Sequence, residues 1–387
     1  MSENDPMLEQ LKSIAKSRVS RRSVLAGAGA VGAGSLLAAC GGGGSGSKVD
    51  VRWGNWTLYL DYDSNKKVYP TLVDFTKKTG INVKYLEDYN DNDEFYGKVQ
   101  GQLKLGKDIG YDLICPTDWM AARYIRLGYA QKLDKANIPN AKNILPALAS
   151  VPYDTDRTYS LTWQGIMGGF TWNKEKLPKG IHTLDELFAP ENKGKIEVLT
   201  ELRDTVGVIM LAQGVDITKF TKDQYYNALD FLQKKISDGF IRQVKGNDYK
   251  EDMISGDAIA VIGWSGDAFQ LAAENDGKFD FAIPESGGTI SADNFIIPST
   301  AQNKAKVEEL INYYYDPVVA ARVAAYVNYI TPVQGAQAAM EKIDPTLVNN
   351  QLIFPSTETQ KKLHVFRNLT PAEETEFTDA FQKATGN

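Results

Sequence analysis

The order of apolar segments along the chain constrains the fold more than any other feature. From Val49 onward, short apolar runs of strand length alternate with longer stretches of helical period. The predicted strands are residues 81–85, 111–115, 196–200, 258–264, 280–284 and 293–298, and the predicted helices are residues 72–78, 204–213, 223–237, 304–325 with a break at Pro317, and 334–340. This alternation is typical of α/β units on largely parallel sheets, and the length of the chain predicts two domains.

Residues 1–39 have the layout of a targeting segment, which is removed and takes no part in the fold. The pair Arg21 and Arg22 lies in a basic stretch that is similar to a twin-arginine export signal, with Val24 where a bulkier apolar residue is commoner. The apolar stretch that follows, residues 26–39, has roughly half the length that a membrane-spanning helix needs. We therefore expect a cleaved signal and no retained transmembrane anchor.

The targeting segment closes with Leu37, Ala38, Ala39 and Cys40, which resembles a bacterial lipobox. In such a sequence the cysteine sulfur receives a diacylglycerol, and two acyl chains suffice for stable anchoring. The alternative is a chance cysteine after an apolar run. Residues 40–47 are then a lipidated Gly/Ser tether, because their composition favours no packed element. We expect a lipoprotein anchored in the membrane through Cys40 and exposed to the periplasm or the outer face of the cell.

The composition excludes several functions. The chain has 43 basic and 49 acidic residues, and residues 1–39 are richer in basic ones, so the remaining body is acidic and is not expected to bind nucleic acid. Cys115 has no cysteine partner in that body, and the two histidines, His182 and His364, stand alone. We therefore expect no disulfide, metal or cofactor. The chain lacks a phosphate-binding loop, a nucleophile elbow and a His-Glu-x-x-His pair, so it is not predicted to be an enzyme.

Aromatic residues stand beside polar or acidic residues at the ends of predicted strands, where open α/β sheets bind their ligands. For each aromatic residue alone, ordinary core packing is the alternative. Five short segments share this feature and supply the candidate residues Trp56, Thr57 and Tyr59; Thr117, Asp118 and Trp119; Trp264 and Asp267; Asp293; and Tyr329.

These segments occur in the same order as in the spermidine/putrescine-binding proteins of ABC importers, which the chain resembles over nearly its whole body. The matching segments are residues 55–59, 75–83, 111–113, 284–288 and 331–332. The resemblance implies a two-lobed fold like that of type 2 periplasmic binding proteins, with mixed sheets flanked by helices and a hinged cleft. One lobe would comprise residues 48–162 and about 293–330, and the other about 163–292 and 331–387.

The resemblance places eight of the candidates in the cleft: Trp56, Thr57, Tyr59, Thr117, Trp119, Trp264, Asp293 and Tyr329. Asp118 and Asp267 are further candidates without a counterpart in the family. A polyamine suits such a site, because Asp293 can pair with an ammonium group and the ring of Trp264 can face both cations and methylenes. The expected partners are a polyamine or a related cation and the permease of an importer, and we expect a monomer.

The sequence also departs from the family pattern. The acidic pair of the family aligns with Leu202 and Thr205, whereas the carboxylates here are Glu201 and Asp204. These two carboxylates either replace the pair or cap a helix, with Asp204 at the expected N-cap. Ser291 stands where the family has a tryptophan, which removes a stacking wall. A different cation or small amine therefore remains an alternative ligand. Ferric ion is another, although the tyrosines at 313–315 are interpreted as packing in an amphipathic helix.

Overall fold

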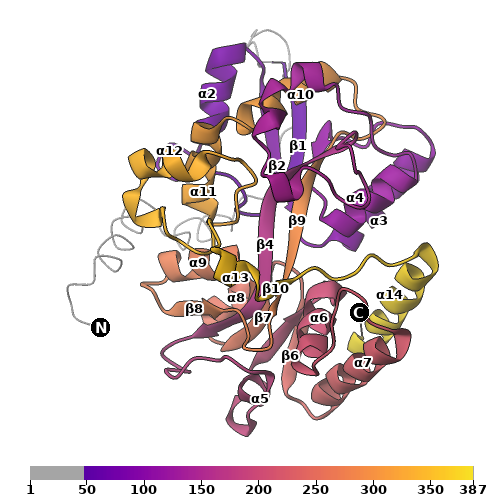
Figure 1. The fold of residues 1–387 in the computed structure, drawn as a ribbon, viewed down its shortest axis with the longest axis vertical. Helices are drawn as coiled ribbons and strands as arrows, with labels where there is room; N and C mark the ends of the chain where they lie inside the picture. Colours follow the sequence, from indigo (N-terminus) through magenta and orange to yellow (C-terminus); the bar gives the residue numbers. More distant parts are fainter. Residues whose placement is uncertain (1–47, 387) are drawn as a thin grey trace, which may run out of the picture.

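The computed structural model describes residues 48–386, and within them ten strands form one mixed sheet (Figure 1). The strand order is β2-β1-β3-β9-β4-β7-β5-β6, with β10 paired to β9 and β8 paired to β4. The strands are β1 (Val51–Trp56), β2 (Val83–Tyr89), β3 (Leu113–Ile114), β4 (Ser160–Asn173), β5 (Ile196–Leu199), β6 (Ile241–Lys245), β7 (Ala260–Trp264), β8 (Phe279–Ala282), β9 (Gly288–Ile296) and β10 (Leu363–His364).

The helices cover this sheet in two groups. They are α2 (Pro70–Thr79), α3 (Asn92–Lys104), α4 (Asp118–Arg126), α5 (Leu184–Leu187), α6 (Leu202–Ala212), α7 (Lys222–Ser237), α8 (Tyr249–Ser255), α9 (Ser265–Glu274), α10 (Lys304–Tyr314), α11 (Pro317–Val327), α12 (Ala336–Ile343), α13 (Thr357–Gln360) and α14 (Pro371–Thr385). Short 3-10 helices are η3 (Lys135–Asn137), η4 (Pro139–Asn143), η5 (Pro146–Leu148), η6 (Pro190–Asn192) and η7 (Pro345–Leu347).

The molecule has two lobes, as the resemblance implies. Lobe 1 contains β1, β2 and β3 with helices α2–α4 and α10–α12, and lobe 2 contains β5–β8 with helices α5–α9 and α14 (Figure 1). The strand pairs β1–β2 and β1–β3 are parallel in lobe 1, and β5–β6 and β5–β7 are parallel in lobe 2. The prediction of parallel α/β units is therefore confirmed within each lobe, whereas the sheet as a whole is mixed.

The long strands β4 and β9 run antiparallel to each other and cross between the lobes (Figure 1). The first half of β4 pairs with β9, and its second half pairs with β7 of lobe 2. All fourteen residues of β4 are buried. A strand buried on both faces has no alternation of polar and apolar residues, which is why the sequence did not predict it.

Each lobe has its own aromatic core. In lobe 1, Trp53 packs against Trp163, and their ring centroids lie 5.4 Å apart. The tyrosine run at 313–315 contributes to this core: Tyr314 is buried against Trp53, and the Tyr315 hydroxyl donates to the Thr162 carbonyl at 2.6 Å. The tyrosines at 313–315, which suggested ferric ion as an alternative ligand, therefore serve to pack the core of lobe 1. In lobe 2, Tyr225 and Phe377 stack with centroids 4.0 Å apart.

Most predicted elements are present with shifted ends. The helix predicted at 72–78 is present as α2, which ends at Thr79 because Gly80 adopts φ 76° and caps it. The strand predicted at 293–298 is wrong at its start, since β9 already begins at Gly288 and Asp293 lies inside it. The strand predicted at 111–115 shortens to two residues. Helix α14 was not predicted.

The exact division of the chain between the lobes stays a prediction. We propose one adjustment, because α12 packs on α11 of lobe 1, and Val333, Met340 and Ile353 share a core cluster with the buried residues of α10 and α11. This packing favours a return to lobe 2 after about residue 353 rather than at 331. The predicted signal, Cys40 and the tether lie outside the described residues. In residues 48–386, no helix is both long and apolar enough to cross a membrane.

Candidate functional site

A cavity lies between the lobes, at the ends of several strands and beside β9, and its empty space, part of it open to solvent, is about 490 Å³. Nine of the twelve predicted site residues line it: Trp56, Thr57, Tyr59, Thr117, Glu201, Asp204, Trp264, Asp293 and Tyr329. Its lining contains four carboxylates, with Asp91 as the fourth, and no lysine, arginine or histidine among the residues that the structure describes. The described lining can therefore offer negative charge to a ligand but no positive charge.

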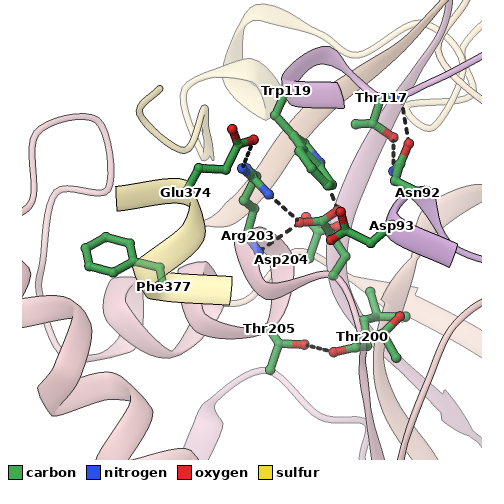
Figure 2. Close-up of polar contacts among 12 residues, drawn as sticks. Asn92, Asp93, Thr117, Trp119, Thr200, Arg203, Asp204, Thr205, Glu374 and Phe377 are labelled. Carbon is green, nitrogen blue, oxygen red and sulfur yellow. Dashed lines mark hydrogen bonds and ion pairs between the residues drawn. The ribbon is translucent and has the colours of Figure 1, made fainter. Parts of the chain in front are cut away.

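Asp293 projects from the middle of β9 and is almost completely buried. The Thr117 hydroxyl donates to Asp293 Oδ1 at 2.7 Å. Asn92 Nδ2 in turn donates to the Thr117 hydroxyl at 2.9 Å (Figure 2). Burial raises the pKa of Asp293 to about 8, although the hydrogen bond from Thr117 opposes the rise. The empty site therefore holds a largely protonated Asp293 at pH 7, and a bound ammonium group would favour its ionised form.

Aromatic rings form the walls of the cavity. Trp56 and Trp264 approach edge to face with centroids 6.2 Å apart, and Tyr59 and Tyr329 do so at 4.9 Å. The Trp56 indole is fixed by its Nε1, which donates to the Cys115 carbonyl at 2.9 Å. These rings offer apolar surface to methylene groups and negative π faces to cations.

Asp204 belongs to α6, and the structure corrects the expectation that it caps this helix. The N-cap is Glu201, whose side chain accepts from the Arg203 backbone N–H at 3.1 Å. Asp204 instead accepts from Trp264 Nε1 at 2.8 Å and from the Thr289 hydroxyl. Burial raises the pKa of Asp204 as well. Its donors are neutral, so its negative charge is available to a ligand when it ionises.

A glycine of β4 makes room for this arrangement. A Cβ atom on Gly168 would lie 2.1 Å from the Thr289 hydroxyl and 2.9 Å from Asp204 Oδ1. Any larger residue at 168 would push Asp204 and Thr289 out of place. The crossing strand therefore supports the site by approaching it closely.

Glu201 caps α6 and also lines the cavity, while its replacement of the acidic pair of the family stays a prediction. Its Oε2 accepts from Trp119 Nε1 at 2.9 Å, and its Oε1 lies 3.3 Å from Arg203 Nη1. Burial raises the pKa of Glu201 to about 7. The neighbouring guanidinium partly neutralises this carboxylate, so it offers a ligand less charge than Asp204 does.

Three predicted site residues lie outside the cavity lining. Trp119 is turned toward Glu201 and Arg203 instead. Asp118 accepts from the Ala292 N–H at 2.9 Å, the Asn294 side chain at 2.8 Å and the Tyr153 hydroxyl, so it fixes β9 next to Asp293.

Asp267 is likewise occupied by protein donors. It accepts from the hydroxyls of Tyr249 and Tyr329, each at 3.0 Å, and pairs with Lys250 at 3.0 Å. The Tyr329 bond is the important one for the site, because Tyr329 lines the cavity. Asp267 therefore orients a wall of the site rather than facing a ligand.

Sequence reasoning missed Asp91, Asn92 and Asn247, which also line the cavity. Asp91 and Asn92 follow β2, and Asn247 follows β6. The available signal was their place at strand ends, which is the feature that identified the other candidates. No aromatic residue that lines the site lies next to them in the sequence, so they were not identified as candidates. Ser291 also lines the cavity, where the family has its tryptophan.

The fold and the cavity define a two-lobed protein that encloses a small ligand between its lobes. The comparison with known families is specific: residues 71–351 match the family described as bacterial extracellular solute-binding proteins. The chain belongs to this family.

Individual relatives agree with this assignment. The chain is 30% identical over 312 residues to the spermidine/putrescine-binding periplasmic protein of Escherichia coli K12, covering 79% of this chain and 85% of the relative. It is 26% identical over 347 residues to the putrescine-binding periplasmic protein PotF of the same organism, covering 85% and 89%.

Solved structures show the same fold. A spermidine/putrescine ABC transporter substrate-binding protein from Streptococcus pneumoniae superimposes with a TM-score of 0.70 at 23% identity, covering 87% of this chain and 98% of that one. The Tp0655 lipoprotein of Treponema pallidum gives a TM-score of 0.71 at 18% identity, covering 87% and 99%.

Proposed function

We propose that this protein binds a linear polyamine of the putrescine or spermidine kind outside the cytoplasm and delivers it to an ABC importer. The observation that carries the proposal is the cavity between the lobes, with four carboxylates, aromatic walls and no cationic side chain in its described lining. The names of the relatives, which include spermidine/putrescine-binding and putrescine-binding proteins, support it. The protein acts as a binding protein and not as an enzyme, in keeping with its family.

The residues that line the cavity bind different parts of a polyamine, according to their chemistry. One ammonium group pairs with Asp293, because a cation without a counter-charge in a closed cavity is costly. The methylene chain lies against Trp56, Trp264 and Tyr329. A second ammonium group pairs with Asp204. Thr57, Tyr59 and Thr117 complete the wall around Asp293 and supply hydroxyl groups.

Calorimetry tests the proposal directly. Putrescine, spermidine and spermine are titrated into the purified protein, with amino acids and sugars as comparison ligands. We expect saturable heat with at least one of the amines and none with the comparison ligands. No heat with any of the three amines would refute the polyamine assignment.

Polyamine binding is expected to release protons. The pKa values of Asp293 and Glu201 are raised to about 8 and about 7, and that of Asp204 is also raised, so the empty site is partly protonated at pH 7. An ammonium group stabilises the ionised carboxylates, so affinity should increase from pH 6 to pH 8.5, where the amines are still charged. Calorimetry at pH 7 in buffers of different ionisation enthalpy measures the released protons. Heats that do not depend on the buffer would contradict this expectation.

The raised pKa values also predict the stability of the empty protein. A carboxyl whose pKa is raised by folding contributes stability that is present below its ordinary pKa, near 4, and is lost as the pH rises through about 8. A bound polyamine compensates for that loss. We therefore expect putrescine to raise the melting temperature more at pH 8 than at pH 6.

The lipid anchor is part of the same proposal. The chain is exported by its twin-arginine signal, acylated at Cys40 and held close to its permease as a monomer on the Gly/Ser tether. Cys40→Ser is expected to move the protein from the membrane fraction to the soluble extracytoplasmic fraction, while binding of putrescine is unchanged. Fractionation and labelling with radioactive palmitate measure this. Membrane association that persists in Cys40→Ser would refute the anchor.

A further inference from the structure

A cluster of charged and aromatic side chains connects the lobes beside the cavity, and of its members only Glu201 also lines the cavity. It consists of Trp119, Arg123 and Arg126 on α4 of lobe 1, and of Glu201, Arg203 and Glu374 in lobe 2. We call it the interlobe cluster. We propose that the interlobe cluster is a latch that holds the lobes closed and slows the release of ligand, an inference that deepens the proposed function and rests on it for its ligand measurements.

Trp119 makes the first connection across the cleft. Its indole Nε1 donates to Glu201 Oε2 at 2.9 Å. The guanidinium of Arg203 covers its ring, and the Cζ atom lies 3.9 Å from the ring centroid. Figure 2 shows Trp119 and Arg203 beside each other. Arg123 of the same helix lies 5.1 Å from the same centroid. A single side chain of lobe 1 is thus bound by a carboxylate and stacked by a cation of lobe 2.

Glu374 makes the second connection. It lies on α14, and its carboxylate approaches Arg126 at 2.9 Å and Arg123 at 3.3 Å. It also lies 3.6 Å from Arg203 (Figure 2). Two of these arginines belong to lobe 1 and one to lobe 2. The Glu374 side chain is only 8% exposed, so its interactions are screened less than those of a surface pair.

Helix α14 belongs firmly to lobe 2, which makes the Glu374 pairs true connections between lobes. Phe377 of α14 stacks on Tyr225 of α7, and the Tyr225 hydroxyl donates to the Phe377 carbonyl at 3.0 Å. Opening the lobes would therefore carry Glu374 away from Arg123 and Arg126. Arg123 would keep Asp93 of lobe 1 at 2.8 Å.

The latch is coupled to the ligand site through Glu201. This carboxylate lines the cavity and is also the acceptor for Trp119. A cation in the cavity favours the ionised form of Glu201, which is the better acceptor for the indole N–H and the better partner for Arg203. Binding of a polyamine therefore strengthens the same contacts that hold the lobes together.

Glu374→Gln is the test, because it removes the charge and keeps the shape. We expect putrescine to dissociate about 10-fold faster in stopped-flow measurements, with its association rate within about twofold of the wild type, since contacts formed after encounter act mainly on dissociation. Trp119→Phe keeps the ring but not the N–H, and we expect an increase of about threefold. If circular dichroism shows that Glu374→Gln does not fold, the dissociation rate of Trp119→Phe tests the latch in its place.

Glu376→Gln is the matched control. Glu376 lies on the same helix, but it pairs with Lys222 of α7 at 2.6 Å, inside lobe 2. Removing that pair should leave the dissociation rate unchanged. Equal dissociation rates for wild type, Glu374→Gln and Trp119→Phe would overturn the latch, as would equal acceleration by Glu374→Gln and Glu376→Gln.

A second readout needs no ligand and separates this inference from the proposed function. Spin labels at Leu105→Cys of lobe 1 and Ile254→Cys of lobe 2, both exposed, report the distance between lobes in the full chain carrying Cys40→Ser. Cys115 is buried and does not compete for the label. In the absence of ligand we expect a larger share of open molecules in Glu374→Gln than in the wild type or Glu376→Gln. Identical distance distributions would refute the latch, whereas a failure to bind any amine would refute only the proposed function.

Discussion

Asp293→Asn is expected to lower the affinity for putrescine by about 300-fold, which is the largest effect of any single change in the site. The substitution removes the charge that pairs with an ammonium group and leaves that group uncompensated in a closed cavity. Losing one partner of a buried charge pair costs about 2–5 kcal/mol, and about 3.4 kcal/mol corresponds to 300-fold. The asparagine Oδ1 can still accept from the Thr117 hydroxyl, so the local geometry is kept.

The fold should tolerate this substitution, and that separates loss of binding from loss of structure. Burial raises the pKa of Asp293 to about 8, so above pH 8 the wild type carries a buried charge that the variant does not have. The empty variant should therefore melt at the same or a higher temperature at pH 8.5. Calorimetry and thermal melts measure the two effects.

Asp280→Asn is a suitable control for the Asp293 experiment, because Asp280 is an exposed carboxylate on β8, 4.0 Å from Lys174. Its replacement should change neither affinity nor melting temperature. A loss of less than about fivefold in Asp293→Asn would place the ammonium group elsewhere.

Much of the site could be predicted because its signals are local in the sequence. Trp56 and Trp264 each end a short strand, and Thr117 comes shortly after one. Strand ends meet at one edge of a parallel unit. The order of these segments then identified the family. Neither inference needed the packing of residues far apart.

The roles of Asp118 and Asp267 could not be predicted in the same way. Both carboxylates stand next to site residues in the sequence, yet each is occupied by protein donors that come from distant segments, such as Asn294 and Tyr329. A sequence shows which carboxylates are near a strand end, but not how many N–H and O–H groups the fold brings to them.

The interlobe cluster was even harder to predict from the sequence, because its residues come from distant segments. Arg126 and Glu374 are 248 residues apart, and α14 was not predicted at all. Strand β4, which connects the lobes, also has no periodic signal because both of its faces are buried. The parts of the protein that govern its closure are thus those made by long-range packing.

The second large effect is expected at Asp204, and it decides which carboxylate replaces the acidic pair of the family. Asp204→Asn should weaken putrescine binding about 50-fold, or about 2.3 kcal/mol, because its donors Trp264 and Thr289 are neutral and its charge serves the ligand. Glu201→Gln should weaken binding by less than about fivefold, since Arg203 already neutralises part of that charge and the glutamine Oε1 can still accept from Trp119.

Thr289→Val distinguishes a charge effect at Asp204 from a structural one. It removes one donor to Asp204 but keeps the carboxylate, so affinity should fall by no more than about threefold. Calorimetry of the three variants at one common pH gives the ranking. If Asp204→Asn and Thr289→Val lose affinity equally, Asp204 acts only by holding Trp264 in place. If Glu201→Gln shows the larger loss, the second ammonium group lies at Glu201, and the polyamine then contacts the interlobe cluster directly.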